Sequence, residues 1–146
     1  FKIGEEKRTS RLKSQDEVTL TGMRALVVED NELNMEIVKF MLEENGILAE
    51  GAGDGVEGVG KFAVSAPGYY NMILMDIMMP RLNGWDTTRK IRSLKRPDAA
   101  TVPIVAMSAN AFAEDIINSR TSGMNVHLAK PLDEKKLMET LRSLFV

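Results

Sequence analysis

The sequence predicts an α/β fold in which five strand–helix repeats, (βα)5, form a doubly wound parallel five-stranded sheet with helices on both faces. From residue 23 to the end of the 146-residue chain, short apolar runs alternate with segments of helical periodicity. This alternation is typical of strands joined by helical crossovers. Some runs are apolar at consecutive positions, as in residues 72–75, which indicates strands buried on both faces of a parallel sheet.

The first two repeats are expected between residues 23 and 66. A strand at 23–28 precedes a helix that Asn45-Gly46 ends, and one face of that helix carries Leu33, Ile37, Val38, Met41 and Leu42. A second strand follows at 47–52. Asp54 then caps a helix that Pro67-Gly68 ends, and its apolar residues recur at helical spacing as Val56, Val59, Ala63 and Ala66.

The remaining three repeats follow the same pattern. Strands are expected at 72–75, 102–107 and 126–129. One helix is expected at about 84–94, before a loop at Pro97, and another at about 113–121, where Gly123 ends it. The last helix carries an apolar stripe of Leu137, Leu141, Leu144 and Phe145.

The composition indicates a single domain. The net charge is -2 and the sequence pI is about 5.5, so direct nucleic-acid binding is not expected. No apolar run approaches the roughly 20 residues that cross a bilayer, and the chain has no cysteine. We therefore expect no membrane contact by this domain and a cytoplasmic location.

We interpret residues 1–21 as a linker or flexible tail and 22–146 as the folded domain. Because Phe1 comes first, we expect a piece of a longer protein.

Polar side chains follow four of the predicted strands. Glu29 and Asp30 come directly after the first strand, and Asp76 follows the third. Ser108 follows the fourth strand and Lys130 the fifth. Each alone is more often a helix cap or a solvated side chain. In an open parallel sheet, however, ligands bind beyond the carboxyl ends of the strands. The occurrence of all five polar side chains at this edge therefore predicts a functional site.

Three carboxylates at one edge need a compensating charge. Each close pair repels by roughly 4 kcal/mol at an effective dielectric of about 20. Lys130 or protonation can remove part of this repulsion, but a hard divalent cation with oxygen ligands compensates it more fully. Mg²⁺ is the best candidate because it takes one or two carboxylates and keeps several waters. Ca²⁺ is less favoured because the chain has no EF-hand loop.

Four short motifs resemble the response-regulator receiver domain. They are Val-Val-Glu-Asp-Asn at 27–31, Met-Asp-Ile-Met-Met-Pro at 75–80, Ser108-Ala109 and Lys130-Pro131. The chain is similar in particular to receiver domains of hybrid sensor histidine kinases. The resemblance assigns the receiver domain to residues 22–146 and implies a flavodoxin-like sheet with strand order 2-1-3-4-5.

The resemblance also implies a phosphorelay chemistry. Asp76 would accept a phosphoryl group from a phosphohistidine on a histidine kinase or a histidine phosphotransfer domain. Glu29, Asp30, Asp76 and the backbone carbonyl of Met78 would hold Mg²⁺. The domain would then catalyse its own phosphorylation and slow dephosphorylation, as part of a hybrid histidine kinase or as a stand-alone regulator. We expect a monomer or a weak dimer.

The same resemblance assigns the switch. Lys130 and Ser108 would contact the phosphoryl group, and the Lys130-Pro131 peptide bond would be cis. Ser108 would move toward the phosphate, and His127 occupies the position where the family usually has an aromatic switch residue. A half-buried histidine with a local hydrogen bond is an equally good interpretation of His127. A role for His127 as a base for a nucleophilic Ser108 is disfavoured, because no third group supports it.

Two other functions compete with this hypothesis. A protein-binding module could keep the receiver fold and act without phosphorylation, although the complete set of five polar residues argues against it. A flavin or nucleotide binder would share the fold. Its loop after the first strand would need glycines and backbone amides to hold phosphate, whereas Glu-Asp-Asn-Glu at 29–32 is acidic. Trp85 and the methionines, including Met75, Met78 and Met79, are interpreted as core residues.

Overall fold

The computed structural model describes residues 19–109 and 112–145 and confirms the predicted sheet. Five parallel strands are arranged in the order β2-β1-β3-β4-β5. The strands are β1 (Arg24–Val28), β2 (Leu48–Ala52), β3 (Met72–Asp76), β4 (Ile104–Ser108) and β5 (Val126–Ala129). The chain runs from β1 outward to β2 and then back across to β3. The strand order therefore reverses between β1 and β3, which is where open α/β sheets bind ligands.

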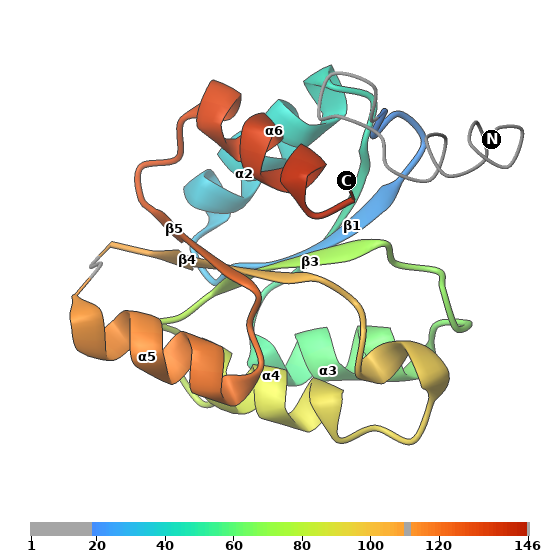
Figure 1. Ribbon diagram of the computed structural model, residues 1–146, viewed down its shortest axis with the longest axis vertical. Coiled ribbons are helices and arrows are strands. Elements are labelled where there is room, and N and C mark those ends of the chain that lie inside the picture. Colours follow the sequence, from blue (N-terminus) through green and yellow to red (C-terminus); the bar gives the residue numbers. More distant parts are fainter. Residues whose placement is uncertain (1–18, 110–111, 146) are drawn as a thin grey trace, which may run out of the picture.

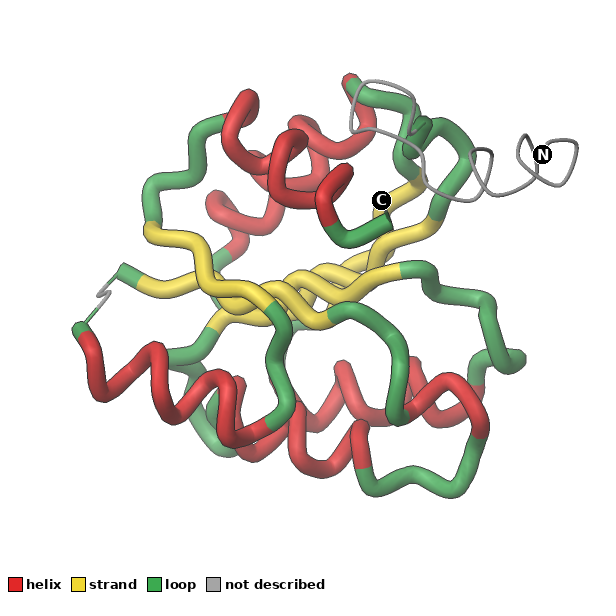
Figure 2. The backbone as a smooth tube through the Cα atoms, in the orientation of Figure 1, coloured by secondary structure: helices red, strands yellow, loops and turns green. Residues whose placement is uncertain are grey.

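Helices cover both faces of the sheet, as the sequence predicts. Figure 1 shows α2 (Glu32–Glu44) and α6 (Glu134–Ser143) on one face. The other face carries α3 (Gly55–Val64), α4 (Gly84–Arg92) and α5 (Ala113–Ser122). A short 3-10 helix, η2 (Pro97–Ala99), lies before β4. Figure 2 shows the strands as the middle of three layers.

Each face of the sheet has its own apolar core. Alternate strand residues point to opposite faces, so Val27 and Leu74 lie in the core beneath α2 and α6. Their neighbours Leu26 and Ile73 lie in the core beneath the other three helices. The strands β3 and β4 are buried along their whole lengths, which explains why their sequences are apolar up to the last residue of each strand.

The apolar face of α2 differs from the predicted one. Val38 and Leu42 are buried in the core. Leu33 and Ile37, predicted on the same face, are 69% and 43% exposed, and Phe40 is 60% exposed. Residues 33, 37 and 40 fall on one side of a helix because they are spaced by four and three. The helix therefore has a second apolar stripe that the domain leaves uncovered in the part of the chain that is described.

The packing of α3 also differs from the prediction. Its buried residues are Gly55, Gly58 and Phe62, whereas Val56 is 53% exposed. A Cβ atom on Gly58 would lie 3.0 Å from a methyl group of Val28, so glycine allows the helix to approach β1 closely. The spacing of apolar residues did not predict this buried face, because two of its residues, Gly55 and Gly58, have no side chain.

One residue of the segment interpreted as a tail packs against the folded domain. Leu20 lies in the segment interpreted as a tail, yet it is 4% exposed and packs in the core beneath α2 and α6. Its carbonyl oxygen accepts a hydrogen bond from Met23 N–H at 3.0 Å. Residues 1–18 of the predicted tail lie outside the described residues. Among the described residues, no helix is both long and apolar enough to cross a membrane.

Candidate functional site at the carboxyl edge of the sheet

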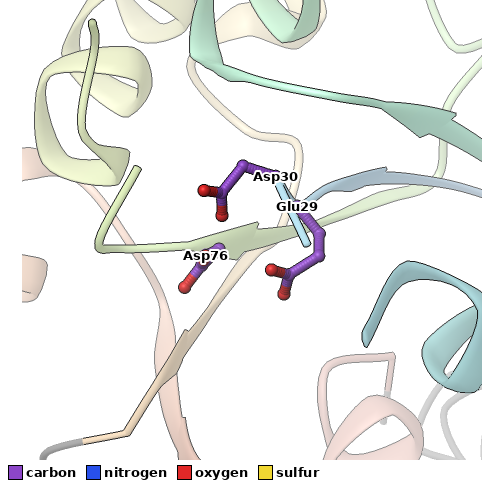
Figure 3. Close-up of side chains that lie close together, drawn as sticks. All are labelled: Glu29, Asp30 and Asp76. Carbon is purple, nitrogen blue, oxygen red and sulfur yellow. The ribbon is translucent and has the colours of Figure 1, made fainter. Parts of the chain in front are cut away.

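The three predicted carboxylates converge where the strand order reverses. Asp76 is the last residue of β3 and is 4% exposed. Glu29 directly follows β1 and is 2% exposed, whereas the next residue, Asp30, is exposed. One carboxylate oxygen of each lies within 4.8 Å of the others, and Figure 3 shows the three side chains around one space. The structure thus brings together the acidic cluster that strand-end positions predict.

Lys130 supplies the positive charge of the site. It follows β5, and its Nζ lies 2.8 Å from Glu29 Oε1 and 3.2 Å from Asp76 Oδ1. The Lys130 backbone N–H donates to the Ser108 carbonyl oxygen at 2.7 Å, which ties the two strand ends together. The expected cis peptide bond between Lys130 and Pro131 is confirmed.

The surroundings raise the pKa of Asp76 to about 7. Burial is the largest cause, because it disfavours the charged carboxylate, and the charge of Glu29 adds to it. The Lys130 ammonium acts in the opposite direction but does not outweigh them. The pKa of Lys130 is itself raised: burial lowers it, but the hydrogen bond to Glu29 and the charge of Asp76 prevail. The site therefore holds more negative charge than one ammonium neutralises.

Glu29 is held by two donors of the protein. Its Oε1 accepts from Lys130 Nζ, and its Oε2 accepts from the Asn31 N–H at 3.2 Å. Asn31 in turn begins α2, since its side chain accepts from Asn34 N–H at 2.9 Å. The start of α2 therefore fixes the Glu29 carboxylate, while the exposed Asp30 carboxylate faces the solvent side of the cluster.

The residues of the site fit a magnesium ion. Three carboxylates offer hard oxygen ligands, Asp30 is open to solvent, and the excess negative charge favours a divalent cation. The role of the Met78 backbone carbonyl stays a prediction. Met78 lies two residues after Asp76, and its side chain is 70% exposed. Its interpretation as a core residue is therefore wrong, whereas Met75 and Met79 are buried.

Ser108 lies on β4, the strand next to Asp76, and His127 lies on β5, one strand further out. Ser108 is the last residue of β4 and is 3% exposed, and the preceding residue, Met107, pairs with Asp76 in the sheet. His127 is half-buried in β5 and lines a pocket of about 620 Å³ together with Ile116 and Lys136. The roles of Ser108 and His127 as a switch stay predictions.

His127 is half-buried, as one of its two interpretations expects. Its Nε2 is buried and has no hydrogen-bond partner among the described residues, so the expected local hydrogen bond is not found at this atom. Burial lowers the pKa of His127, and the charge of Asp115 opposes that shift. Trp85 packs against the core as predicted, and its Nε1–H donates to Ser119 Oγ at 3.0 Å.

Sequence reasoning missed a charged contact beside the site. Arg81, in the loop after β3, forms an ion pair with Asp54 at the start of α3. The sequence identified Asp54 only as a helix cap, which it also is, because its side chain accepts from Glu57 N–H. The two residues are 27 positions apart, and nothing local in the sequence relates them.

Comparison with known proteins agrees with this geometry. The family model described as "Response regulator receiver domain" matches residues 25–142. The chain is 41% identical over 129 residues to an osmosensing histidine protein kinase of Saccharomyces cerevisiae, covering 86% of this chain. It is 33% identical over 141 residues to a probable histidine kinase 2 of Oryza sativa, covering 89% of this chain. The alignments span only 10% and 14% of those two relatives.

Solved structures show the same fold. One is the receiver domain of a sensor histidine kinase of Pseudomonas aeruginosa PAO1, with a magnesium ion coordinated in its active-site cleft. It is 34% identical, its TM-score is 0.77, and the match covers 86% of this chain and 98% of that one. A chemotaxis protein of Vibrio cholerae, 23% identical with a TM-score of 0.77, covers 84% and 98% and shows likeness of fold. Together with the family match over residues 25–142, these similarities show that the chain belongs to the response-regulator receiver family.

Proposed function

We propose that this receiver domain accepts a phosphoryl group from a phosphohistidine onto the Asp76 carboxylate in the presence of Mg²⁺. The observation that carries the proposal is the position of Asp76: a buried carboxylate at the switch point of the sheet, with two more carboxylates within 4.8 Å and an ammonium at 3.2 Å. Phosphoryl transfer requires a positioned nucleophile and cations that neutralise the charge of the phosphoryl group; Asp76 would be the nucleophile, and Lys130 and a Mg²⁺ ion held by the carboxylates would supply the positive charge.

The transfer step converts the Asp76 carboxylate into an acyl phosphate. An Oδ atom of ionised Asp76 forms a bond to phosphorus while the bond between phosphorus and the donor imidazole nitrogen breaks. The imidazole leaves with the electron pair of that bond and takes up a proton. Hydrolysis of the resulting acyl phosphate by water returns the Asp76 carboxylate and releases inorganic phosphate.

Each residue of the site has a distinct part in this step. Lys130 lies between Glu29 and Asp76 in the resting site, so its Nζ can turn to a phosphoryl oxygen without leaving the pocket. Ser108, buried at the end of β4, would donate to another phosphoryl oxygen. Asp30 and Asp76 would hold Mg²⁺, with Glu29 contributing from its more enclosed position. When bound, Mg²⁺ neutralises the charge that develops on the phosphoryl oxygens.

The exposed stripe of α2 supports a helical phosphotransfer partner. Leu33, Ile37 and Phe40 form this stripe, and Ile37 also lines a small pocket with Lys130 and Pro131. The stripe is therefore continuous with the edge that carries the phosphoacceptor. Apolar residues at this spacing suit a partner helix that lies against α2, and such a partner would bring its phosphohistidine to Asp76.

Intact-mass measurement tests the acceptor. The native chain is incubated with a small phosphodonor, with and without Mg²⁺, alongside Asp76→Asn and the matched control Asp86→Asn, whose side chain is half exposed on α4. We expect one phosphate on the native chain and on Asp86→Asn, dependent on Mg²⁺, and none on Asp76→Asn. A native chain that gains no phosphate would favour the binding module that acts without phosphorylation.

A second measurement tests the partner surface. Phe40→Ala should slow phosphoryl transfer from a phosphorylated histidine phosphotransfer domain by roughly tenfold, because truncation of an aromatic contact commonly costs 1 to 2 kcal/mol. Uptake from a small phosphodonor should not change, because that donor needs no docking surface. The exposed Val64 of α3 provides the control, as Val64→Ala. An equal loss of rate with both donors would mean that Phe40→Ala disturbs the fold and not the docking of a partner.

A further inference from the structure

The loop between β3 and α4, residues 77–83, contains a strained turn. Arg81 has a φ of 69°, in the left-handed region that residues other than glycine rarely adopt. Leu82 N–H donates to the Pro80 carbonyl oxygen at 2.7 Å, which closes a three-residue turn around Arg81. Turns of this kind with a positive φ are rare. Such strain persists only where the surroundings impose it.

An ion pair holds the tip of this loop to a different part of the domain. Arg81 Nη2 donates to Asp54 Oδ2. The other oxygen, Asp54 Oδ1, accepts from Glu57 N–H at 2.8 Å and so begins α3. The Asp54 side chain is only 18% exposed, although Arg81 is 66% exposed. One carboxylate therefore fixes both the start of α3 and the tip of the loop.

Two glycines pack the same loop closely against its neighbours. A Cβ atom on Gly55 would lie 2.7 Å from the Leu82 carbonyl oxygen. One on Gly84 would lie 2.8 Å from Ile77 Cα, at the other end of the loop. Gly84 N–H also donates to the Ile77 carbonyl oxygen at 2.8 Å. The loop is thus closed at its base beside Asp76, and the contact with the start of α3 sets the position of its tip.

We propose that Arg81 and Asp54 are positioning residues for the phosphoacceptor site. Their ion pair holds residues 77–83 in the shape that Mg²⁺ binding requires, and the two side chains act through the loop backbone. This inference rests on the proposed function and on the predicted contact between Mg²⁺ and the backbone carbonyl of Met78, which lies in the same loop. It gives the strained turn a role, because the loop would otherwise relax toward ordinary backbone conformations and lose the cation site.

Two substitutions remove the ion pair without adding strain. Asp54→Asn loses the charge but keeps an oxygen that caps α3, because Asn is as favourable as Asp at that position. Arg81→Gly loses the guanidinium and suits the positive φ. Asp86→Asn serves as the matched control, because it removes an ion pair to Arg89 at 2.7 Å that lies within α4 and outside the loop. Thermal unfolding identifies any variant that is not folded.

The Mg²⁺ affinity is measured by titration calorimetry, without a phosphodonor. Asp54→Asn and Arg81→Gly should each weaken binding roughly three- to tenfold, and the double variant should be no weaker than the weaker single variant, since both remove one interaction. Asp86→Asn should bind as the native chain does. Amide hydrogen exchange at Leu82 and Gly84, measured without Mg²⁺, should be faster in both loop variants and unchanged in the control.

The outcomes separate this inference from the proposed function. If the native chain binds Mg²⁺ and takes up phosphate, but both loop variants match it in affinity and in amide exchange, the positioning role is overturned and the proposed function stands. Additive losses in the double variant would also contradict a shared role. A native chain that neither binds Mg²⁺ nor takes up phosphate overturns the proposed function, and the positioning role with it.

Discussion

Two carboxylates of the same sheet have opposite surroundings. Glu50, in β2, accepts hydrogen bonds from Tyr69 Oη at 2.5 Å and Tyr70 Oη at 2.8 Å, and Arg24 Nε lies 3.4 Å away. The Arg24 guanidinium also stacks over the Tyr69 ring at 4.1 Å. Asp76, in contrast, lies beside two more carboxylates and one shared ammonium.

The pKa values of the two groups follow this difference. The hydrogen bond from Tyr69 is the largest cause that holds the pKa of Glu50 below its ordinary value. Burial and the Glu29 charge raise the pKa of Asp76 to about 7. The charge of Glu50 is compensated by Arg24 and two tyrosine hydroxyls, so these contacts stabilise the fold. The carboxylates around Asp76 still need a cation. Four substitutions test this contrast, in order of expected effect.

The largest effect is expected for Lys130→Met. It removes the ammonium shared by Glu29 and Asp76, and phosphate uptake from a small donor should slow about a hundredfold, a usual loss for one preorganised charged contact in a reaction site. Initial rates followed by intact mass provide the measurement, with the exposed Lys90→Met as control. A loss of less than threefold would mean that Lys130 balances charge only in the resting site.

Asp76→Asn should change the pH dependence of stability. In the native chain the folded pKa of Asp76, about 7, exceeds the ordinary value of 3.8, so the folded state binds more protons between these values and stability falls as pH rises from about 4 to 7. Asp76→Asn should remove that loss and be more stable than the native chain at pH 8, by an amount of the order of 2 kcal/mol. Near pH 4 the two should be equally stable.

Urea unfolding with a chelator at both pH values measures this difference, and titrating groups that do not interact with Asp76 cancel in the comparison. A variant that is less stable than the native chain at pH 8 would contradict the raised pKa. Added Mg²⁺ should stabilise the native chain at pH 8 and leave Asp76→Asn nearly unchanged, because a ligand stabilises only the state that binds it.

Glu50→Gln should have the converse result. It removes the charge that Arg24 and the two tyrosines compensate, and the free energy of unfolding should fall by about 1 kcal/mol, since the group is partly exposed and solvent screens the loss. Phosphate uptake should stay at the native rate. Thermal unfolding and intact mass measure the two quantities. Slower uptake with unchanged stability would reverse the roles assigned to the two clusters.

Tyr69→Phe should have the smallest effect. It removes one of two hydroxyl donors to Glu50, and Tyr70 continues to donate from a more buried position. A loss of about 0.5 kcal/mol is expected, at the low end of the range for a hydrogen bond near the surface. Chemical denaturation measures it, and Tyr70→Phe in the same series should lose more. A larger loss of stability for Tyr69→Phe than for Tyr70→Phe would show that the exposed tyrosine contributes more to holding Glu50.

The acidic cluster was predictable because sheet topology places the carboxyl ends of parallel strands at one edge. Residues 29, 30, 76 and 130 could therefore be brought together from their positions after apolar runs. The exposed side of α2 was not predictable, because the apolar spacing of Leu33 and Ile37 resembles that of a core face. Likewise Gly58 is buried where α3 contacts β1 because it has no side chain. Hydrophobic periodicity does not identify a glycine as a contact residue.

Contacts between separate loops were also beyond the sequence. The pair between Arg81 and Asp54, and the cluster around Glu50, depend on how the helices are placed over the sheet. The sequence indicated Asp54 as a cap because capping is local. Its second partner is fixed only when the loop after β3 folds back against the start of α3. Local capping and the meeting of strand ends were predictable, and contacts between separate loops were not.

The central claim is that Asp76 is the carboxylate that takes the phosphoryl group. A crystal structure of the native chain with Mg²⁺ and beryllofluoride, a stable mimic of a phosphoryl group, tests it most directly. The mimic should be bonded to an Oδ atom of Asp76, with Mg²⁺ on Asp30 and Asp76 and with Lys130 Nζ moved onto a fluoride. The mimic bonded to another carboxylate, or absent from Asp76 while Mg²⁺ is bound at the site, would contradict it.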